Sequence, residues 1–160
     1  MSIKAGERMP EGKFKVMSDK GPQDLTTKEL FDGKRVVLFS VPGAFTPTCD
    51  AKHLPGYLQL ADKLRAKGVD TIACMAVNDV FVMNAWGKAS NVAGKVLMLA
   101  DGNGDYARAL GLELDGKGFG MGMRGQRFAI IVDKGVATHV DVEAPGQFKV
   151  SAAEAVLAQL

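Results

Sequence analysis

Cysteine is the residue type in this chain that combines nucleophilic and redox chemistry, and the chain has two of them. Cys49 ends the segment Pro-Gly-Ala-Phe-Thr-Pro-Thr-Cys, which follows an apolar run and precedes a helical pattern. Thr46 is predicted to be the N-cap of that helix, and Pro47 suits its first turn. Unpaired backbone N–H groups and the helix dipole favour a negatively charged sulfur at such a position. We therefore expect Cys49 to be a reactive thiolate.

The other cysteine, Cys74, lies in the middle of an apolar run, where period-two alternation puts Ile72, Cys74 and Ala76 on one face of a strand. Free cysteine is among the most frequently buried residue types. From its setting alone, Cys74 is expected to be a small core side chain.

The elements that must position Cys49 alternate between strands and helices. Apolar runs predict strands at Phe14 to Val16, Arg35 to Val41, Val69 to Val77 and Val96 to Ala100. Spacings of three and four residues predict helices at Thr26 to Leu30, Thr48 to Lys67, Val80 to Ala89 and Tyr106 to Leu110. This alternation is typical of a largely parallel sheet covered by helices.

The last third of the chain has a different pattern. Two strands, Arg127 to Asp133 and Val136 to Val142, are separated only by Lys-Gly, which predicts a tight antiparallel hairpin. A closing helix follows, for which Ser151 is the predicted N-cap and Glu154 the partner in a capping box. The glycine-rich segment Leu114 to Gly125 is expected to be a flexible loop.

Two further local signals concern helix geometry. Thr26 and Glu29 have the spacing of a capping box, which predicts a short helix there. Pro55 interrupts the helix after Cys49 and is expected to kink it, because it has no N–H to donate to Ala51.

Composition sets limits on the kind of protein. The 160 residues fit one α/β domain spanning 1–160. Twenty basic side chains oppose 18 acidic ones without any run of one sign, so neither nucleic acid nor a membrane surface is an expected partner. The first residues lack the apolar stretch of a secretory signal, and two cysteines are too few for a disulfide framework. We expect a cytoplasmic location with reduced thiols.

The segment Pro42 to Cys49 resembles the P-x-x-x-T-x-x-C active-site motif of peroxiredoxins. Together with the following Lys-His-Leu-Pro-Gly-Tyr it resembles the type II, or peroxiredoxin-five, subfamily of the alkyl hydroperoxide reductase and thiol-specific antioxidant superfamily. Further similar segments, VDTIACMAVND, LADGNGDYARALG and RFAIIVDKG, extend the resemblance over residues 14–160. It implies a thioredoxin-like fold, a central mixed sheet with flanking helices.

The resemblance also implies an activity and assigns roles. The chain would be an antioxidant thiol peroxidase that reduces hydrogen peroxide and organic hydroperoxides. Cys49 would be the peroxidatic cysteine, Thr46 would hydrogen-bond the peroxide, and Pro42 would shield the sulfur. Arg127 matches the active-site arginine, which stabilises the thiolate and the leaving oxygen. Arg124, three residues earlier, is the alternative.

Other residues are expected around the pocket. Gly43 lies within the motif, and Phe45 and Phe119 are candidates for the pocket wall or for the surface of the implied homodimer. His53 follows Cys49 by one helical turn and is expected to line the pocket rather than transfer protons. The spacing of the cysteines and histidines matches no zinc pattern, so neither a metal nor another cofactor is expected.

A sulfenic acid at Cys49 must be reduced by a second thiol. The resemblance allows Cys74 to be a resolving cysteine, but a disulfide needs Cα atoms within ~7 Å of each other. If Cys74 is structural instead, glutathione with glutaredoxin, or thioredoxin, must reduce Cys49. The sequence leaves both routes open, and with them the preferred peroxide and the reductant of the cell.

Three other functions use the same residues. A thioredoxin-like thiol-disulfide oxidoreductase requires Cys-x-x-Cys, and Thr46 occupies the position of its partner thiol. A cysteine hydrolase requires a histidine base, for which His53 is poorly directed. A non-enzymatic redox sensor would need only the reactive thiol.

Overall fold

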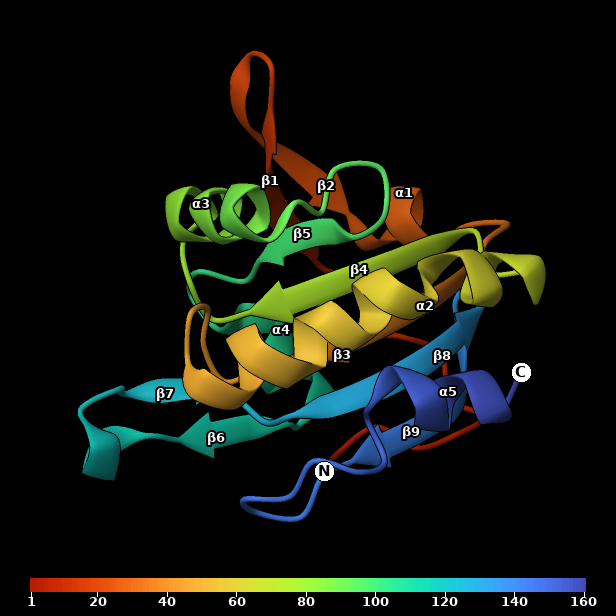
Figure 1. Cartoon of the computed structure of the whole chain (residues 1–160). Helices are drawn as coiled ribbons and strands as arrows, with labels where there is room; N and C mark the ends of the chain where they lie inside the picture. The colour runs from red at the N-terminus through yellow and green to blue at the C-terminus, as the bar shows by residue number, and fades with distance from the viewer.

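Seven strands form one mixed sheet at the centre of the molecule (Figure 1). The computed structural model describes residues 1–160. In spatial order the strands are β2 (Gly21–Thr26), β1 (Lys13–Ser18), β5 (Leu97–Ala100), β4 (Thr71–Ala76), β3 (Arg35–Ser40), β8 (Phe128–Asp133) and β9 (Val136–Val142). Strands β3, β4 and β5 run parallel, and the other neighbours pair antiparallel. The predicted mixed α/β sheet is confirmed.

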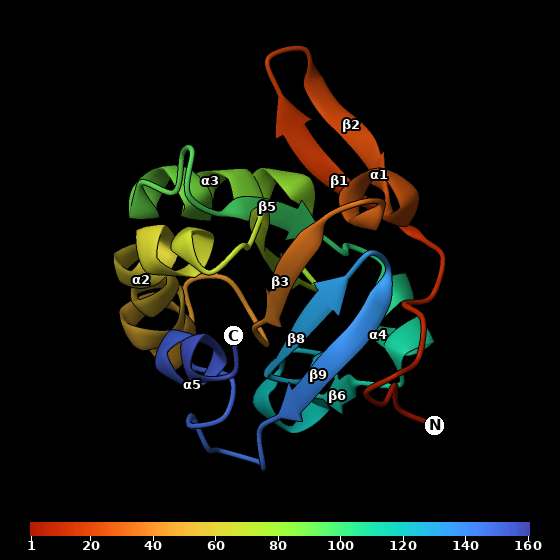
Figure 2. The same ribbon diagram turned by 90° about the vertical axis from the view of Figure 1, so that its right-hand side faces the viewer.

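Helices cover both faces of this sheet (Figure 2). On one face lie α2 (Leu54–Ala66), α3 (Val80–Ser90) and α5 (Ala153–Ala158). On the other lie the shorter helices α1 (Thr27–Phe31) and α4 (Asp105–Leu110). None of these helices has both the length and the apolar sequence needed to cross a bilayer.

Strict alternation along the central strands produces two separate cores. In β3, Val37 and Phe39 pack toward α2, whereas Val36 and Leu38 pack toward α1 and α4. The strand β4 follows the same rule, and the predicted face of Ile72, Cys74 and Ala76 belongs to the α2 side. Both cysteines therefore lie in the same core cluster, on the same side of the sheet.

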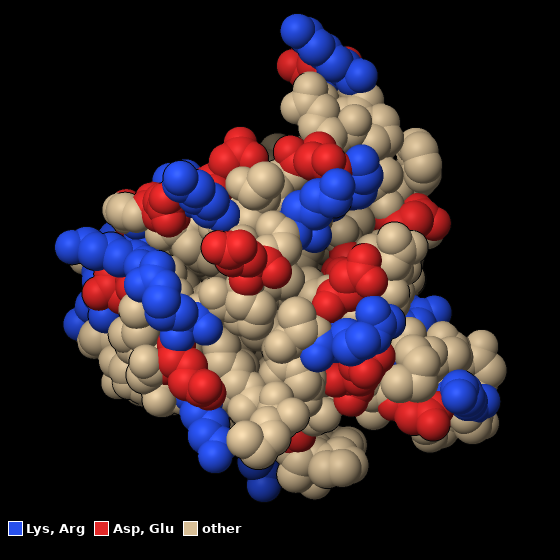
Figure 3. Space-filling view, turned by 180° about the vertical axis from the view of Figure 1, so that it is seen from behind, with Lys and Arg blue, Asp and Glu red and all other residues tan.

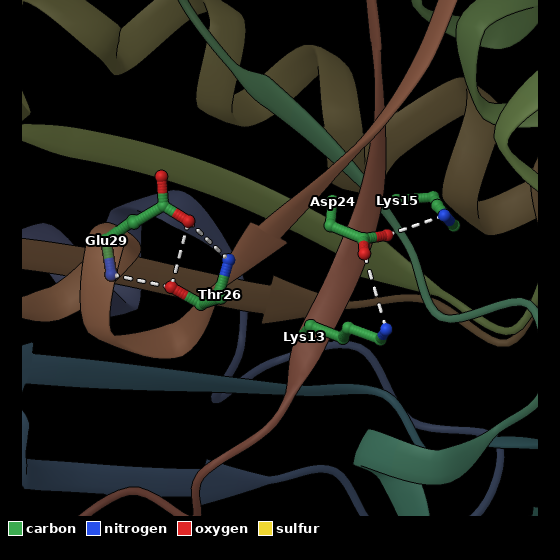
Figure 4. A network of polar contacts seen from close by, with 5 residues as sticks. All are labelled: Lys13, Lys15, Asp24, Thr26 and Glu29. Atoms are coloured by element: carbon green, nitrogen blue, oxygen red, sulfur yellow. Dashed lines mark hydrogen bonds and ion pairs between the residues drawn. The ribbon is translucent and has the colours of Figure 1, made fainter.

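The capping box at the start of α1 is confirmed. The Thr26 hydroxyl oxygen accepts from the backbone N–H of Glu29, and the Glu29 carboxylate accepts from that of Thr26 (Figure 4). The same figure shows Lys13 and Lys15 paired with Asp24 across β1 and β2. Those ion pairs are solvent-exposed and contribute little to stability.

The predicted hairpin between β8 and β9 is also confirmed. Lys134 and Gly135 connect the strands with positive φ angles of 50° and 86°, the conformation that a tight two-residue turn requires. A bulge between Ile131 and Val132 shifts the pairing register, which alternation alone did not indicate.

The glycine-rich segment Leu114 to Gly125 is not the flexible loop that we expected. It forms a two-stranded ribbon, β6 (Glu113–Asp115) and β7 (Met123–Gly125), joined by the 3-10 turn η2 (Lys117–Phe119). Glycines 120 and 122 adopt positive φ angles, which allows the chain to return. The repeated glycines conceal any strand periodicity, so the ribbon is held by pairing rather than by local preference.

Two further expectations require correction. The closing helix α5 begins at Ala153 with Ala152 as its N-cap, and no side chain caps it. Ser151 is therefore not the cap, because its hydroxyl donates to the Glu143 carboxylate instead. Strand β2 was not expected at all, since Gly21 and Pro22 are poor strand formers; it forms by pairing with β1.

Charged side chains are mixed over the face opposite to that of Figure 1. Basic and acidic groups alternate there without a large patch of one sign (Figure 3). This distribution agrees with the near balance of 20 basic and 18 acidic residues.

Candidate active site

Cys49 lies where the chain turns from the end of β3 into the helix α2. Helical conformation begins at Pro47, and Cys49 opens a π-turn, η1 (Cys49–His53), in which the Leu54 N–H donates to the Cys49 carbonyl. The helix interruption expected at Pro55 is thus a wider turn just before it, and Pro55 lies in the first turn of α2. Proline is tolerated in the first turn of a helix because a backbone N–H at that position would have no partner within the helix.

The loop before Cys49 is held by short hydrogen bonds. The Thr46 carbonyl accepts from the Asp50 N–H at 2.9 Å, so Thr46 stands at the N-cap position as predicted. Its hydroxyl, however, does not cap the helix and donates to the Gly43 carbonyl at 2.7 Å. Phe45 has a φ of 64°, and the Ala44 N–H donates to Asn78 at 2.9 Å. These hydrogen bonds hold the loop in this conformation, and the Thr46 oxygen keeps lone pairs free to accept a further hydrogen bond.

Arg127 brings the only guanidinium that contacts the Cys49 sulfur. It directly precedes β8, which pairs with β3, and its Nη2 lies 3.1 Å from Sγ of Cys49. The sulfur is fully buried, so little water screens this contact. A positive charge at hydrogen-bond distance favours the thiolate over the thiol.

His53 holds the other arm of that guanidinium. Its Nδ1 accepts from Nη1 of Arg127 at 2.8 Å, and its Nε2 donates to the Ser151 carbonyl at 3.0 Å. Burial, and after it the charge of Arg127, lower the pKa of His53 from 6.5 to about 3. The imidazole is therefore neutral, with its proton on Nε2.

Arg124 lies nearby but does not contact the sulfur. Its Nε donates to the Met121 carbonyl at 2.9 Å and its Nη1 to the Pro42 carbonyl at 3.3 Å. A Cβ on Gly43 would come within 2.9 Å of that Nη1, so glycine lets the guanidinium approach the loop without shifting. Arg124 thus holds the loop of Pro42 and Gly43 in place.

Cys74 is fully buried in β4, opposite Phe39 of β3 and Met98 of β5. Burial raises the pKa of its thiol well above the usual value, and negative charge at Cys49 raises it further. Both cysteines are free thiols in this structure. Burial therefore favours the protonated form of the Cys74 thiol in the folded chain.

A surface cavity of about 210 Å³ leads to the Arg127 guanidinium. Its lining includes Pro42, Thr48, Leu114 and Phe148. Larger hollows lie elsewhere, among them one of about 590 Å³ beside α1 and one of about 480 Å³ between β1 and α3. We assign the chemistry to the cavity of about 210 Å³ because Arg127, which contacts the Cys49 sulfur, lines it.

Two expected pocket residues are not brought to the sulfur. Phe119 is 85% exposed on η2, at the end of the β6–β7 ribbon. The prediction that it lines the pocket is therefore wrong for a single chain. Phe45 is half exposed, with its ring 6.3 Å from that of Trp86. His139 contacts Thr138 on β9 and takes no part in the site.

Sequence reasoning missed several residues that hold the site together. The Trp86 indole N–H donates to Asp50 at 2.9 Å, which ties the turn after Cys49 to α3. The Tyr57 hydroxyl donates to the Ser151 carbonyl at 2.7 Å. The only signal for Ser151 was its capping pattern, which indicated a role within the helix rather than at the site.

Known proteins are similar to this chain over almost its whole length. The Redoxin family model matches residues 4–157. Peroxiredoxin-2B of Arabidopsis thaliana is 45% identical over 159 residues, covering 99% of this chain and 98% of the relative. Among solved structures, reduced Prx3 of Vibrio vulnificus in complex with H₂O₂ is 54% identical with a TM-score of 0.94, over 98% of each chain. Peroxiredoxin 5 of Alvinella pompejana is 38% identical with a TM-score of 0.86, over 98% of this chain and 96% of that one.

Proposed function

This chain belongs to the redoxin family as a peroxiredoxin of the type II, or peroxiredoxin-five, kind and is thus a thiol peroxidase, and we propose that Cys49, Thr46 and Arg127 perform its chemistry. The observation that carries this assignment is the 3.1 Å contact between Arg127 Nη2 and the Cys49 sulfur. It supplies positive charge where a thiolate forms and where a leaving oxygen becomes negative.

The reaction is a displacement on oxygen. The Cys49 thiolate attacks the terminal oxygen of a hydroperoxide, an S–O bond forms, and the O–O bond breaks. Cysteine sulfur is oxidised to a sulfenic acid, while the other oxygen leaves as hydroxide or alkoxide and takes up a proton to become water or an alcohol. Arg127 stabilises the charge that moves from sulfur to the leaving oxygen.

Thr46 orients the peroxide. Because its hydroxyl hydrogen is committed to the Gly43 carbonyl, its oxygen is left to accept a hydrogen bond from the peroxide O–H. Pro42 lines the same cavity and shields the sulfur from water. Reduced Prx3 of Vibrio vulnificus forms a complex with H₂O₂, and this similarity supports a small peroxide as the substrate of the site here.

The reductant is an external thiol in this proposal. Cys74 is a buried, protonated thiol within β4, which disfavours it as a resolving cysteine. Glutathione with glutaredoxin, or thioredoxin, would reduce the sulfenic acid of Cys49. Because the sulfur is fully buried, a reductant of that size requires the turn η1 to open after oxidation.

We also propose a homodimer and a cytoplasmic location. Large apolar side chains are exposed around the rim of the site and on the β6–β7 ribbon, and they would be covered by a second copy: Phe45, Leu114, Phe119 and Met123. Two free thiols suit a reducing compartment. Relatives from Arabidopsis and rice include chloroplastic proteins, so organelles belong among the places to be tested.

Peroxide consumption tests the assignment. Wild type, Cys49→Ser and Cys74→Ala are compared with glutathione plus glutaredoxin and with thioredoxin plus its reductase. We expect Cys49→Ser to lose turnover with every donor and Cys74→Ala to keep it with at least one. Peroxide consumption by Cys49→Ser at the wild-type rate would refute the assignment, and a single turnover without regeneration would indicate a redox sensor.

A further inference from the structure

The loop between β9 and α5 is folded back by one carboxylate. A single oxygen of Glu143 accepts from the Lys149 N–H at 2.7 Å, the Ser151 N–H at 2.8 Å and the Ser151 hydroxyl at 2.6 Å. Burial alone would raise the pKa of Glu143, but these hydrogen bonds outweigh it, and the pKa lies below its usual value. Glu143 is therefore an ionised carboxylate that fixes the position of Ser151.

The carbonyl of Ser151 points the other way, into the core. It accepts two donors, Nε2 of His53 at 3.0 Å and the hydroxyl of Tyr57 at 2.7 Å. Because a carbonyl can only accept, it requires the proton of His53 to be on Nε2. The lone pair of Nδ1 is then available for Nη1 of Arg127, at 2.8 Å.

These contacts close into a ring around the active-site arginine. The backbone N–H of Glu143 donates to the backbone carbonyl of Arg127 at 3.0 Å. Glu143 is thus bonded directly to the main chain of Arg127 and, through Ser151 and His53, to its guanidinium. A side chain held at both ends of its length has few alternative orientations.

The loop closed by Glu143 also covers this arrangement. It carries Phe148, whose ring lies edge-on to His53 with centroids 5.0 Å apart. The Arg127 Cζ lies 5.9 Å from the centroid of the same ring. Phe148 therefore shields the arginine–histidine pair from solvent on the side of the cavity.

We propose that Glu143 is a positioning residue of the peroxidatic site, which aims Arg127 at the Cys49 sulfur by fixing Ser151 and the tautomer of His53. The inference rests on the proposed function, since it assigns a purpose to the arginine. With Nη1 committed to His53, only Nη2 remains directed at the sulfur. If the loop loses its hydrogen bonds to Glu143, the His53 ring can rotate. The guanidinium of Arg127 is then no longer held in the orientation that directs Nη2 at the sulfur.

Three single variants test the ring. Glu143→Gln keeps the size of the side chain but removes its charge, and Ser151→Ala removes one of the three donors. Glu154→Gln is the matched control, because it removes the same charge from an exposed position on α5. We expect Glu143→Gln to slow the reaction of Cys49 with hydrogen peroxide about tenfold, because small displacements of a catalytic group are costly. Ser151→Ala should slow it less, and Glu154→Gln should match wild type.

A double-mutant cycle separates positioning from loss of stability. If Glu143 acts through Arg127, then Glu143→Gln should cost much less in an Arg127→Lys background than in wild type. Equal costs in the two backgrounds would overturn the inference, as would a Glu143→Gln variant that reacts like wild type. Thiolate absorbance at neutral pH gives a second readout, expected to fall in Glu143→Gln and to stay constant in Glu154→Gln.

These experiments distinguish failure of the positioning role of Glu143 from failure of the proposed function. If wild type does not consume peroxide, the proposed function itself fails. If wild type is active and Cys49→Ser is not, but Glu143→Gln equals Glu154→Gln, only the positioning role fails. If thermal unfolding shows that Glu143→Gln does not fold, the double-mutant cycle is run with Ser151→Ala instead. An equal cost of Ser151→Ala in the wild-type and Arg127→Lys backgrounds would then overturn the inference.

Discussion

Nη1 of Arg127 lies 2.8 Å from Nδ1 of His53, and this contact defines the electrostatics of the site. A guanidinium can only donate, so Nδ1 must carry a lone pair and the imidazole must be neutral. His53 therefore acts as a fixed acceptor for Arg127 and is not a general base for Cys49. The remaining arm of the fork is left to the sulfur, 3.1 Å away.

Replacing Arg127 should reduce reactivity far more than replacing Arg124. Lysine keeps the charge of Arg127 but cannot bond both His53 and the sulfur. We expect Arg127→Lys to lower the rate constant with hydrogen peroxide on the order of a hundredfold, as for the loss of one preorganised donor. Arg124→Lys disturbs only the loop of Pro42 and should cost less than about tenfold. Stopped-flow kinetics would contradict this assignment if the order of the two effects were reversed.

His53 should make the folded state sensitive to mild acid. Its pKa is about 3 when folded and 6.5 in its ordinary state, so between these values the unfolded chain binds a proton that the folded chain does not. Stability is therefore lost as the pH falls through this window, by about 2 kcal/mol between pH 7 and pH 5. Urea unfolding at the two pH values measures the loss.

Two variants serve as controls for that pH dependence. His53→Gln can accept from Arg127 and donate to Ser151 without titrating, so its stability should change less between pH 7 and pH 5. His139→Gln alters a histidine that only contacts Thr138, so it should keep the wild-type loss. The carboxylates with lowered pKa, such as Glu143, lose their contribution only at lower pH, because their usual value is already 4.5. Equal losses in wild type and His53→Gln would contradict the assignment.

The sequence predicted the parts of the site that depend on local chemistry. Thr46 and Cys49 stand at a helix start because the Thr-Pro spacing favours it, and Arg127 directly precedes an apolar strand. The tight turn at Lys134 follows equally from residues adjacent in the chain. Alternation along β4 was sufficient to place Cys74 on the face that turned out to be the α2 side.

The rest depends on contacts between residues far apart in the chain. Ser151 is 98 positions from His53, and no local pattern could indicate that its carbonyl would bind the imidazole. Its capping pattern even indicated the wrong role, because the hydroxyl satisfies Glu143 instead of a helix N–H. The β6–β7 ribbon was missed because its glycines carry no side-chain periodicity. Tertiary pairing decided these cases.

Cys74 should remain unreactive until the protein unfolds. Burial keeps its thiol protonated, and the strand pairing on both sides keeps reagents away. We expect Cys74→Ala to retain turnover with glutathione and glutaredoxin, and an alkylating reagent to label Cys74 only in urea. Loss of turnover with every donor, or rapid labelling of Cys74 in the native protein, would identify it as a resolving cysteine.

Trp86 should report the opening of the turn that carries Cys49. It is the single tryptophan of the chain, and its indole N–H is bonded to Asp50, the neighbour of Cys49. If η1 opens after oxidation, this bond breaks and the emission of Trp86 changes with one equivalent of peroxide. Cys49→Ser should show no change, and an unchanged wild-type spectrum with complete oxidation would mean that the turn stays closed.

The ionisation and oxidation of Cys49 can be followed together in one experiment. Reduced wild type is titrated by thiolate absorbance and then mixed with hydrogen peroxide at neutral pH, with Cys49→Ser and Arg127→Lys treated in parallel. We expect wild type to hold one thiolate at neutral pH, to lose it in a single fast step and to gain one oxygen by mass spectrometry. Cys49→Ser should show neither signal, and Arg127→Lys should react slowly. A protonated Cys49 at neutral pH that reacts with peroxide no faster than a free thiol would contradict the central claim that Arg127 holds this sulfur as the attacking thiolate.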